Sequence, residues 1–391
     1  MHKFLSAKVV LFMSINLKKA YVFFLCVYLV ALPLGAMSIG GIGSALRLLA
    51  ILPVLLSIWQ LNRFYLNAPI KMYFIYILIC GISVLFSLDI TPAWSKYSSL
   101  LLLFLLLASS CCYVYTNREI EQLKKSLVWS SRISCALCIL FNTFVEGRMY
   151  FQNDVFSEDP NYFCAYLAFG AIYAVEKLLN SDEGIKNRIL ALGEIGVYLT
   201  VALLTGSRGG TLALLFGIMM FIVLSNRRIV SFKTVLIVAV VLISLYMGTQ
   251  LLTEDILARF TFQNVLETGG TGRTVIWAKA LDMYNNSNIF RKIFGQGIGN
   301  TITAWSHYGF LETHVCHNMF IESLVEIGIV GLIAYSLTIF SFIKQAFKRQ
   351  KYAFGVIMVM FFLSLSTSIS TFKPYINIML FILCLENCKE E

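Results

Sequence analysis

The chain has 391 residues, of which 58% are hydrophobic and only 13% are charged, and its formal net charge is +10. A soluble domain carries roughly 25% charged residues, so this composition excludes a series of water-soluble domains. The basic excess does not indicate nucleic-acid binding, because most lysines and arginines flank apolar runs, where short basic loops face anionic lipid.

Apolar runs recur along the chain with lengths close to the ~20 residues that cross a bilayer. Because lipid offers the backbone no hydrogen-bond partners, each run is expected to be a helix. The predicted spans lie near 18–37, 45–61, 70–88, 97–116, 126–145, 161–179, 189–204, 210–225, 234–252, 317–343, 352–371 and 375–388. The sequence therefore predicts an all-α, polytopic membrane protein with about 12 transmembrane helices. It forms a single integral membrane domain over 1–391.

Lysine and arginine concentrate in alternate connecting segments. The positive-inside rule then places both termini in the cytoplasm. Segment 253–316 becomes one large periplasmic loop between spans 9 and 10, and loops of this length are usually functional or disordered. Apolar residues at helical spacing within 273–284 predict a short amphipathic helix lying on the bilayer. The G-Q-G-I-G-N stretch at 295–300 lacks the βαβ setting of a dinucleotide site, and is either a flexible turn near a ligand or a plain loop.

A glycine-rich turn, T-G-S-R-G-G at 205–210, joins two short predicted spans. Its glycines let backbone N–H groups approach a ligand closely, and it leads into a helix N-terminus, which favours anions. Arg208 could therefore hold an anion, although a tight hairpin whose arginine reaches the lipid surface explains the pattern equally well. Arg47, near the outer end of the second span, has the same two interpretations: a lipid-phosphate contact or an arginine that snorkels.

Three of the four histidines, His307, His314 and His317, fall on the predicted outer side just before the tenth span. Histidine titrates near neutral pH and can act as a general base. A zinc site is the alternative, but His314, Cys316 and His317 are too crowded to ligate one ion, and no second cluster completes a tetrahedral set. We expect neither a metal nor a cofactor.

The pattern H-N-x9-G-x-x-G at 317–331 resembles the one carried by the O-antigen ligase and O-antigen polymerase superfamily. Similar segments occur in the same order: D-P-N-Y-F at 159–163, the turn at 205–210, G-R-T-V-I-W at 272–277 and the glycine stretch at 295–300. The resemblance covers about 155–345, and the first third of the chain adds only its hydropathy profile.

This resemblance implies a membrane glycosyltransferase of the bacterial inner membrane whose active site faces the periplasm. It would transfer an undecaprenyl-diphosphate-linked glycan to an acceptor sugar. The implied roles are a base or acceptor-positioning group at His317, diphosphate contacts at Arg208 and Arg273, and further substrate contacts. These further contacts are Arg259, Asn161, Asn318, His314 and Arg47.

The acceptor distinguishes two activities within the superfamily. A polymerase uses a second lipid-linked repeat, and a ligase uses lipid A-core. The segments G-R-T-x-x-W and D-P-N-Y-F favour a surface-polysaccharide polymerase, for which a chain-length regulator protein is an expected partner. A polysaccharide-lipid transporter is the alternative from another class, but the chain has few mid-membrane charges and no internal repeat.

Overall fold

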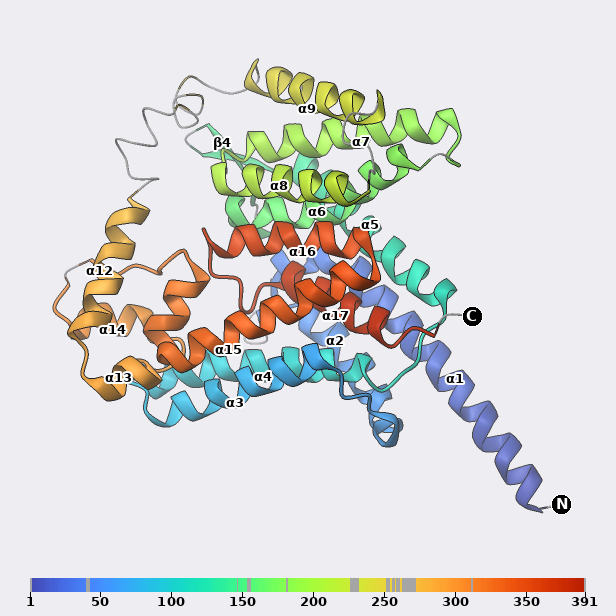
Figure 1. Cartoon of the computed structure of the whole chain (residues 1–391), viewed down its shortest axis with the longest axis horizontal. Coiled ribbons are helices and arrows are strands. Elements are labelled where there is room, and N and C mark those ends of the chain that lie inside the picture. Colours follow the sequence, from blue (N-terminus) through green and yellow to red (C-terminus); the bar gives the residue numbers. More distant parts are fainter. Residues whose placement is uncertain are drawn as a thin grey trace.

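The computed structural model describes residues 2–39, 43–145, 147–152, 156–180, 182–225, 232–250, 272–310 and 312–389, together with residues 254, 257 and 261. It is a bundle of long helices (Figure 1). The first nine are α1 (His2–Val30), α2 (Leu46–Ile58), α3 (Ala68–Leu85), α4 (Ile90–Ser110), α5 (Asn117–Leu140), α6 (Pro160–Leu179), α7 (Ile185–Leu204), α8 (Arg208–Ser225) and α9 (Phe232–Gln250). The others are α12 (Arg273–Asn286), α13 (Ile289–Phe294), α14 (Thr301–His307), α15 (Met319–Arg349), α16 (Lys351–Ser364) and α17 (Lys373–Glu386).

Every predicted span overlaps one of the helices α1 to α9 or α15 to α17. Six of the described helices are long and apolar enough to cross a membrane, namely α3, α4, α6, α7, α8 and α15. Shorter apolar helices lie at α2, α16 and Thr234–Gln250. These findings show a multi-pass, mainly helical membrane protein. The count of about 12 crossings and the periplasmic placement of 253–316 stay predictions.

Short strands between the helices were not expected from the sequence. The span predicted to end at 145 ends as α5 at Leu140, and an antiparallel sheet of β3 (Thr143–Val145), β4 (Arg148–Gln152) and β5 (Ser157–Glu158) follows. A second pair, β1 (Ser38–Ile39) and β2 (Gly43–Ser44), lies between the 3-10 helix η1 (Leu32–Ala36) and α2. A bridge between Met37 and Phe156 joins the two strand regions.

The core of the bundle surrounds α6, which packs against α5, α7, α8 and α16. In α17, each residue from Pro374 to Leu385 is buried. Buried faces on both sides explain why these helices read as nearly continuous apolar runs rather than as one apolar stripe.

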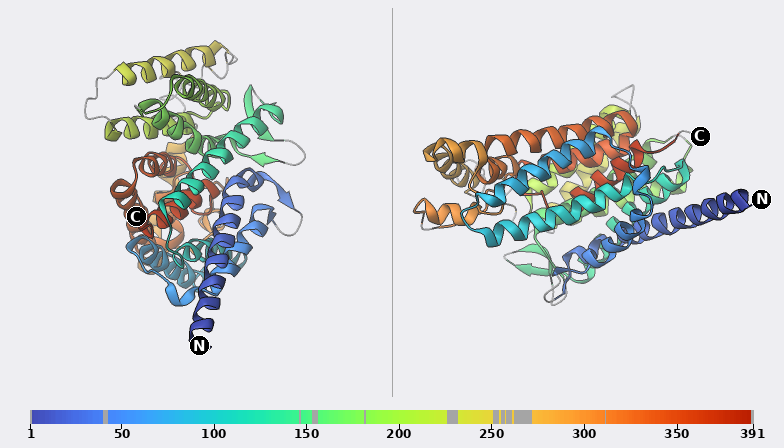
Figure 2. Two further views of the ribbon diagram at one scale, coloured as in Figure 1. Left: turned by 90° about the vertical axis from the view of Figure 1, so that its right-hand side faces the viewer. Right: turned by 90° about the horizontal axis from the view of Figure 1, so that it is seen from below.

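The described part of segment 253–316 forms α12, α13 and α14, all of which contact α15. These three helices lie at one end of the bundle, and the beginning of α1 and the end of α17 lie at the other (Figures 1 and 2). The helix predicted over 273–284 is present as α12. Its Ala280 and Met283 pack into a small core with Trp305, Cys316 and Val325.

The glycine stretch at 295–300 is wedged against a kink in α15. Gly328 has φ 70° inside that helix, and the backbone N–H groups of Gln296 and Gly297 donate to the carbonyls of Val325 and Glu326, both at 2.9 Å. A Cβ on Gly328 would lie 2.2 Å from the carbonyl oxygen of Ile293. Only glycine fits this left-handed, crowded position, which gives a physical reason for the first glycine of G-x-x-G.

Candidate functional site

Four helix beginnings bring together the polar residues of one end of the bundle. Asp159 caps α6, Arg208 begins α8, Arg273 begins α12, and His317 lies two residues before α15. The charge on Arg273 interacts with those on Arg208 and Asp159, and His317 interacts with Arg273 and Asp159. The Nη1 atom of Arg273 lies 3.7 Å from where a Cβ would stand on Gly209, beside Arg208. The structure thus places Arg208, Arg273 and His317 in one cluster.

The turn at 205–210 is held by the beginning of α6. Gly206 has φ 62°, a conformation that glycine adopts without strain. The Ser207 hydroxyl donates to Asn161 Oδ1 at 2.9 Å and accepts from the N–H of Gly210 at 3.0 Å. The Nδ2 of Asn161 donates to Asp159 Oδ1 at 2.7 Å. Asn161, predicted to contact substrate, is therefore also the residue that fixes the turn carrying Arg208.

An arginine that the sequence motifs did not single out joins this cluster. Arg148 of β4 donates from Nε to the carbonyl of Thr205 at 3.0 Å, and its guanidinium lies over the ring of Tyr150, 5.4 Å from the centroid. Its charge also acts on Arg273. The only available signal was an arginine in a predicted outer segment, because the strand that carries it was not expected.

His317 has an unusual backbone conformation. Among the described residues it is the only non-glycine with a positive φ, at 48°, and such conformations cost about 1–3 kcal/mol unless the surroundings enforce them. Its neighbours do so. Trp277 Nε1 donates to the carbonyl of Cys316 at 2.8 Å, and Asn318 Oδ1 accepts from the N–H groups of Phe320 and Ile321 at 3.0 and 3.2 Å.

Burial lowers the pKa of the His317 imidazole, and the nearby Arg273 guanidinium lowers that pKa further. The imidazole is therefore mostly neutral at neutral pH, the form that can accept a proton. Burial lowers the pKa of Arg273, as does the charge of Arg208, but a guanidinium in a protein keeps its proton. Three arginines against one Asp159 carboxylate leave an excess of positive charge, which can hold a multiply charged anion beside a neutral base.

Several predicted site residues have other surroundings. Asn318 caps α15, and its Nδ2 donates to the carbonyl of Leu365 at 3.1 Å, so both ends of its amide have backbone partners. His314 packs edge-on against Trp305 and lies 3.6 Å from Glu312. Arg47 lies at a separate place, where its Nη2 donates to Ser99 of α4 at 3.3 Å. Arg259 lies outside the described residues.

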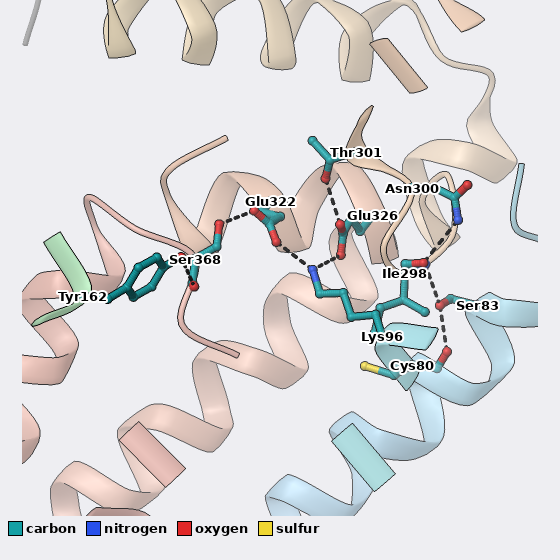
Figure 3. Close-up of polar contacts among 10 residues, drawn as sticks. All are labelled: Cys80, Ser83, Lys96, Tyr162, Ile298, Asn300, Thr301, Glu322, Glu326 and Ser368. Atoms are coloured by element: carbon teal, nitrogen blue, oxygen red, sulfur yellow. Dashed lines mark hydrogen bonds and ion pairs between the residues drawn. The ribbon is translucent and has the colours of Figure 1, made fainter. Parts of the chain in front are cut away.

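A buried ion cluster involves two carboxylates in the first turns of α15 (Figure 3). Lys96 Nζ is 2.7 Å from Glu322 Oε1 and 2.8 Å from Glu326 Oε2. Ser368 donates to the other oxygen of Glu322, and the carbonyl of Ser368 accepts from Tyr162 of α6 at 2.8 Å. These contacts link α4 to α15 and α6, whose beginnings adjoin His317 and Asp159. Sequence reasoning missed the cluster because its members lie far apart in the chain.

No group of three His, Cys, Asp or Glu side chains within the described residues is arranged to hold a metal ion. The cluster around His317 combines an excess of positive charge with an imidazole whose pKa is lowered by burial. Acid–base chemistry next to a charged leaving group is what such a combination can support.

Comparison with known proteins bears on the same region. The sequence model of the family described as Wzy_C, O-antigen ligase, matches residues 195–336, which include Arg208, Arg273 and His317. This match confirms the resemblance to the O-antigen ligase and polymerase superfamily. No curated protein matches the sequence.

One solved structure, described as a peptidoglycan synthase complex that coordinates polymerization and crosslinking, contains a similar chain with 14% sequence identity. The match covers 81% of this protein and 95% of that chain. Its TM-score of 0.43 is too low to support an argument.

Proposed function

We propose that this protein is a surface-polysaccharide polymerase of the bacterial inner membrane. It would transfer an undecaprenyl-diphosphate-linked glycan to an acceptor sugar on the periplasmic side. The observation that carries the proposal is the convergence of Arg208, Arg273 and a neutral His317 at one end of the bundle, within the segment that matches the family.

The residues fit glycosyl transfer from a diphosphate. His317 accepts the proton of the acceptor hydroxyl as the hydroxyl oxygen attacks the anomeric carbon, and general bases contribute ~10²–10⁴-fold to such rates. The anomeric C–O bond to the diphosphate breaks, and the leaving group keeps the electron pair. Arg208 and Arg273 stabilise the charge that develops there through paired, charge-assisted hydrogen bonds. Arg148 adds a third guanidinium on the same side.

Three further residues hold the proposed catalytic groups in place through hydrogen bonds. Asn161 sets the position of the turn that carries Arg208. Asn318 and Trp277 hold the backbone on either side of His317. We assign them positioning roles, and keep Arg259 and His314 as candidate contacts for the glycan.

A ligase that passes the glycan to lipid A-core is the second candidate, because the matching family is described by that activity. The preference for a polymerase rests on the segments G-R-T-x-x-W and D-P-N-Y-F. A transporter is disfavoured because the predicted spans hold few charged residues and the sequence shows no internal repeat.

A glycolipid gel of a deletion strain, with and without the restored gene, separates these functions. Lipid A-core that bears a single repeat identifies a polymerase, and bare lipid A-core with long chains on undecaprenyl diphosphate identifies a ligase. Arg208→Ala, Arg273→Ala and His317→Ala should each abolish long chains at normal protein level. Full activity of all three variants would refute the assignment.

Matched controls are available on the same chain. His307→Ala removes a histidine that contacts Tyr308, and Arg63→Ala removes an exposed arginine. Both control variants should make long chains normally. Arg208→Lys keeps the charge but loses the paired geometry, so it should be poor if bidentate contacts to the diphosphate matter.

A further inference from the structure

A second group of cations lies apart from the cluster around His317. Arg47 of α2 and Lys373 of α17 line a cavity of about 150 Å³ between α2, α4 and α17. The Nη2 of Arg47 donates to Ser99, and Nζ of Lys373 donates to the carbonyl of Gly35 at 2.9 Å. Among the described residues, neither cation forms an ion pair with a carboxylate.

The two charges are close enough to repel each other. Glu158 is the acidic group whose charge reaches Lys373, and its Oε2 accepts a hydrogen bond from Tyr166 at 2.8 Å. Two cations facing one carboxylate leave a net positive charge. Charge complementarity therefore calls for an anion in this cavity.

Beside the cations the cavity is lined by the hydroxyl-bearing residues Ser44, Ser99 and Thr371. Farther along α4 its wall is apolar and consists of Leu102, Leu103 and Leu106. Nearby on α2, Leu48 and Leu52 are 44% and 39% exposed. A cavity with cations at one side and an apolar wall along a membrane helix fits a lipid with a phosphate headgroup and a long hydrocarbon chain.

Two adjacent residues, Glu158 and Asp159, show where the Arg47–Lys373 cavity lies relative to the cluster around His317. Glu158 interacts with Lys373, whereas Asp159 interacts with Arg273 and His317. Neighbouring Cα atoms are about 3.8 Å apart, so the two cation groups flank one short segment of chain between β5 and α6.

We propose that the Arg47–Lys373 cavity binds the phosphate headgroup of the acceptor, a second polyprenyl-linked glycan. This inference rests on the proposed polymerase function, since a polymerase needs two lipid-linked substrates at once. The attacking hydroxyl belongs to a sugar of the acceptor repeat, and that glycan separates it from the acceptor's own phosphate. The acceptor phosphate therefore has to bind apart from the donor diphosphate, as this cavity would allow.

Lipid binding can be measured without turnover. Purified protein in phosphatidylcholine nanodiscs is titrated with undecaprenyl phosphate, and bound lipid is counted by native mass spectrometry. The wild-type protein should bind two molecules, and Arg47→Gln with Lys373→Gln should bind one, with the second site weakened about tenfold or more. Glutamine at 373 can still donate to Gly35, and an unchanged thermal unfolding temperature shows that the fold is kept. Lys348→Gln, an exposed lysine at the far end of α15, is the matched control.

The outcomes separate the two proposals. If wild type and the Arg47/Lys373 double variant bind the same number of lipids, the acceptor cavity is refuted. Arg273→Ala should remove the other lipid, and two lipids bound to that variant would count against the proposed donor site while leaving this cavity standing. Displacement of the cavity lipid by equimolar phosphatidylglycerol would also refute the proposal, because any anionic bilayer lipid would then suffice.

Discussion

Removal of the Lys96 charge tests how firmly the beginning of α15 is held. The side chains of Glu322 and Glu326 are only 5% and 4% exposed, and each lies within 2.8 Å of Lys96 Nζ. Lys96→Met keeps the length of the side chain but leaves two carboxylates with no cation beside them. Breaking a buried ion pair by removing one partner costs roughly 3–5 kcal/mol. We therefore expect the free energy of unfolding to fall by about that amount.

The measurement is an unfolding titration with sodium dodecyl sulfate in detergent micelles. The triple variant with Lys96→Met, Glu322→Gln and Glu326→Gln should recover most of the loss, because no buried charge is then left unpaired. Lys348→Met serves as the control, since Lys348 is exposed. The reasoning is refuted if Lys96→Met unfolds within about 1 kcal/mol of wild type, or if the triple variant is as unstable as the single one.

Three further predictions address the site and its supports. The pKa of the His317 imidazole should lie below its ordinary value of about 6.5. Arg273→Gln removes the nearby positive charge and should raise this pKa, so that the imidazole becomes protonated at a higher pH than in the wild-type protein. NMR of the ring of labelled histidine measures the midpoint, and an unmoved midpoint would contradict the prediction. Gly328→Ala should lower the unfolding temperature, because the new Cβ meets the carbonyl of Ile293 at 2.2 Å, whereas Gly184→Ala, with open space around it, should not. Trp277→Phe loses the hydrogen bond next to His317, which is worth about 1 kcal/mol. The variant should lower kcat and change KM less, and an unchanged kcat in a polymerisation assay would show that this bond does not position the base.

Hydropathy and short motifs predicted much of this arrangement. Runs of apolar residues identify the helices because neither lipid nor the interior of the bundle offers water to the backbone, so its N–H and C=O groups must bond to each other within a helix. Arg208, Arg273 and His317 could be singled out as candidates because each sits in a local pattern next to a helix beginning. Their proximity could not be predicted from spacing alone, since it depends on how α8, α12 and α15 pack.

The residues that were missed or reinterpreted depend on partners far away in the chain. Lys96 lies 226 residues from Glu322, so no local pattern joins them. Arg148 sits on a strand within a region where only helices and loops were expected. Asn318 was predicted to contact substrate, but its amide serves the backbone of α15 and the carbonyl of Leu365.

The contacts on either side of His317 hold its strained backbone conformation in place. Cys316 is held through Trp277 of α12, and Asn318 is held through the loop after α16, so the residue between them has little freedom to relax. Arg273 begins the same helix that carries Trp277. A shift of α12 would therefore move Arg273 together with the backbone support at Cys316. A catalytic group needs placement within about 0.5 Å of its productive geometry, and under the proposed function the contacts at Cys316 and Asn318 would give His317 that placement.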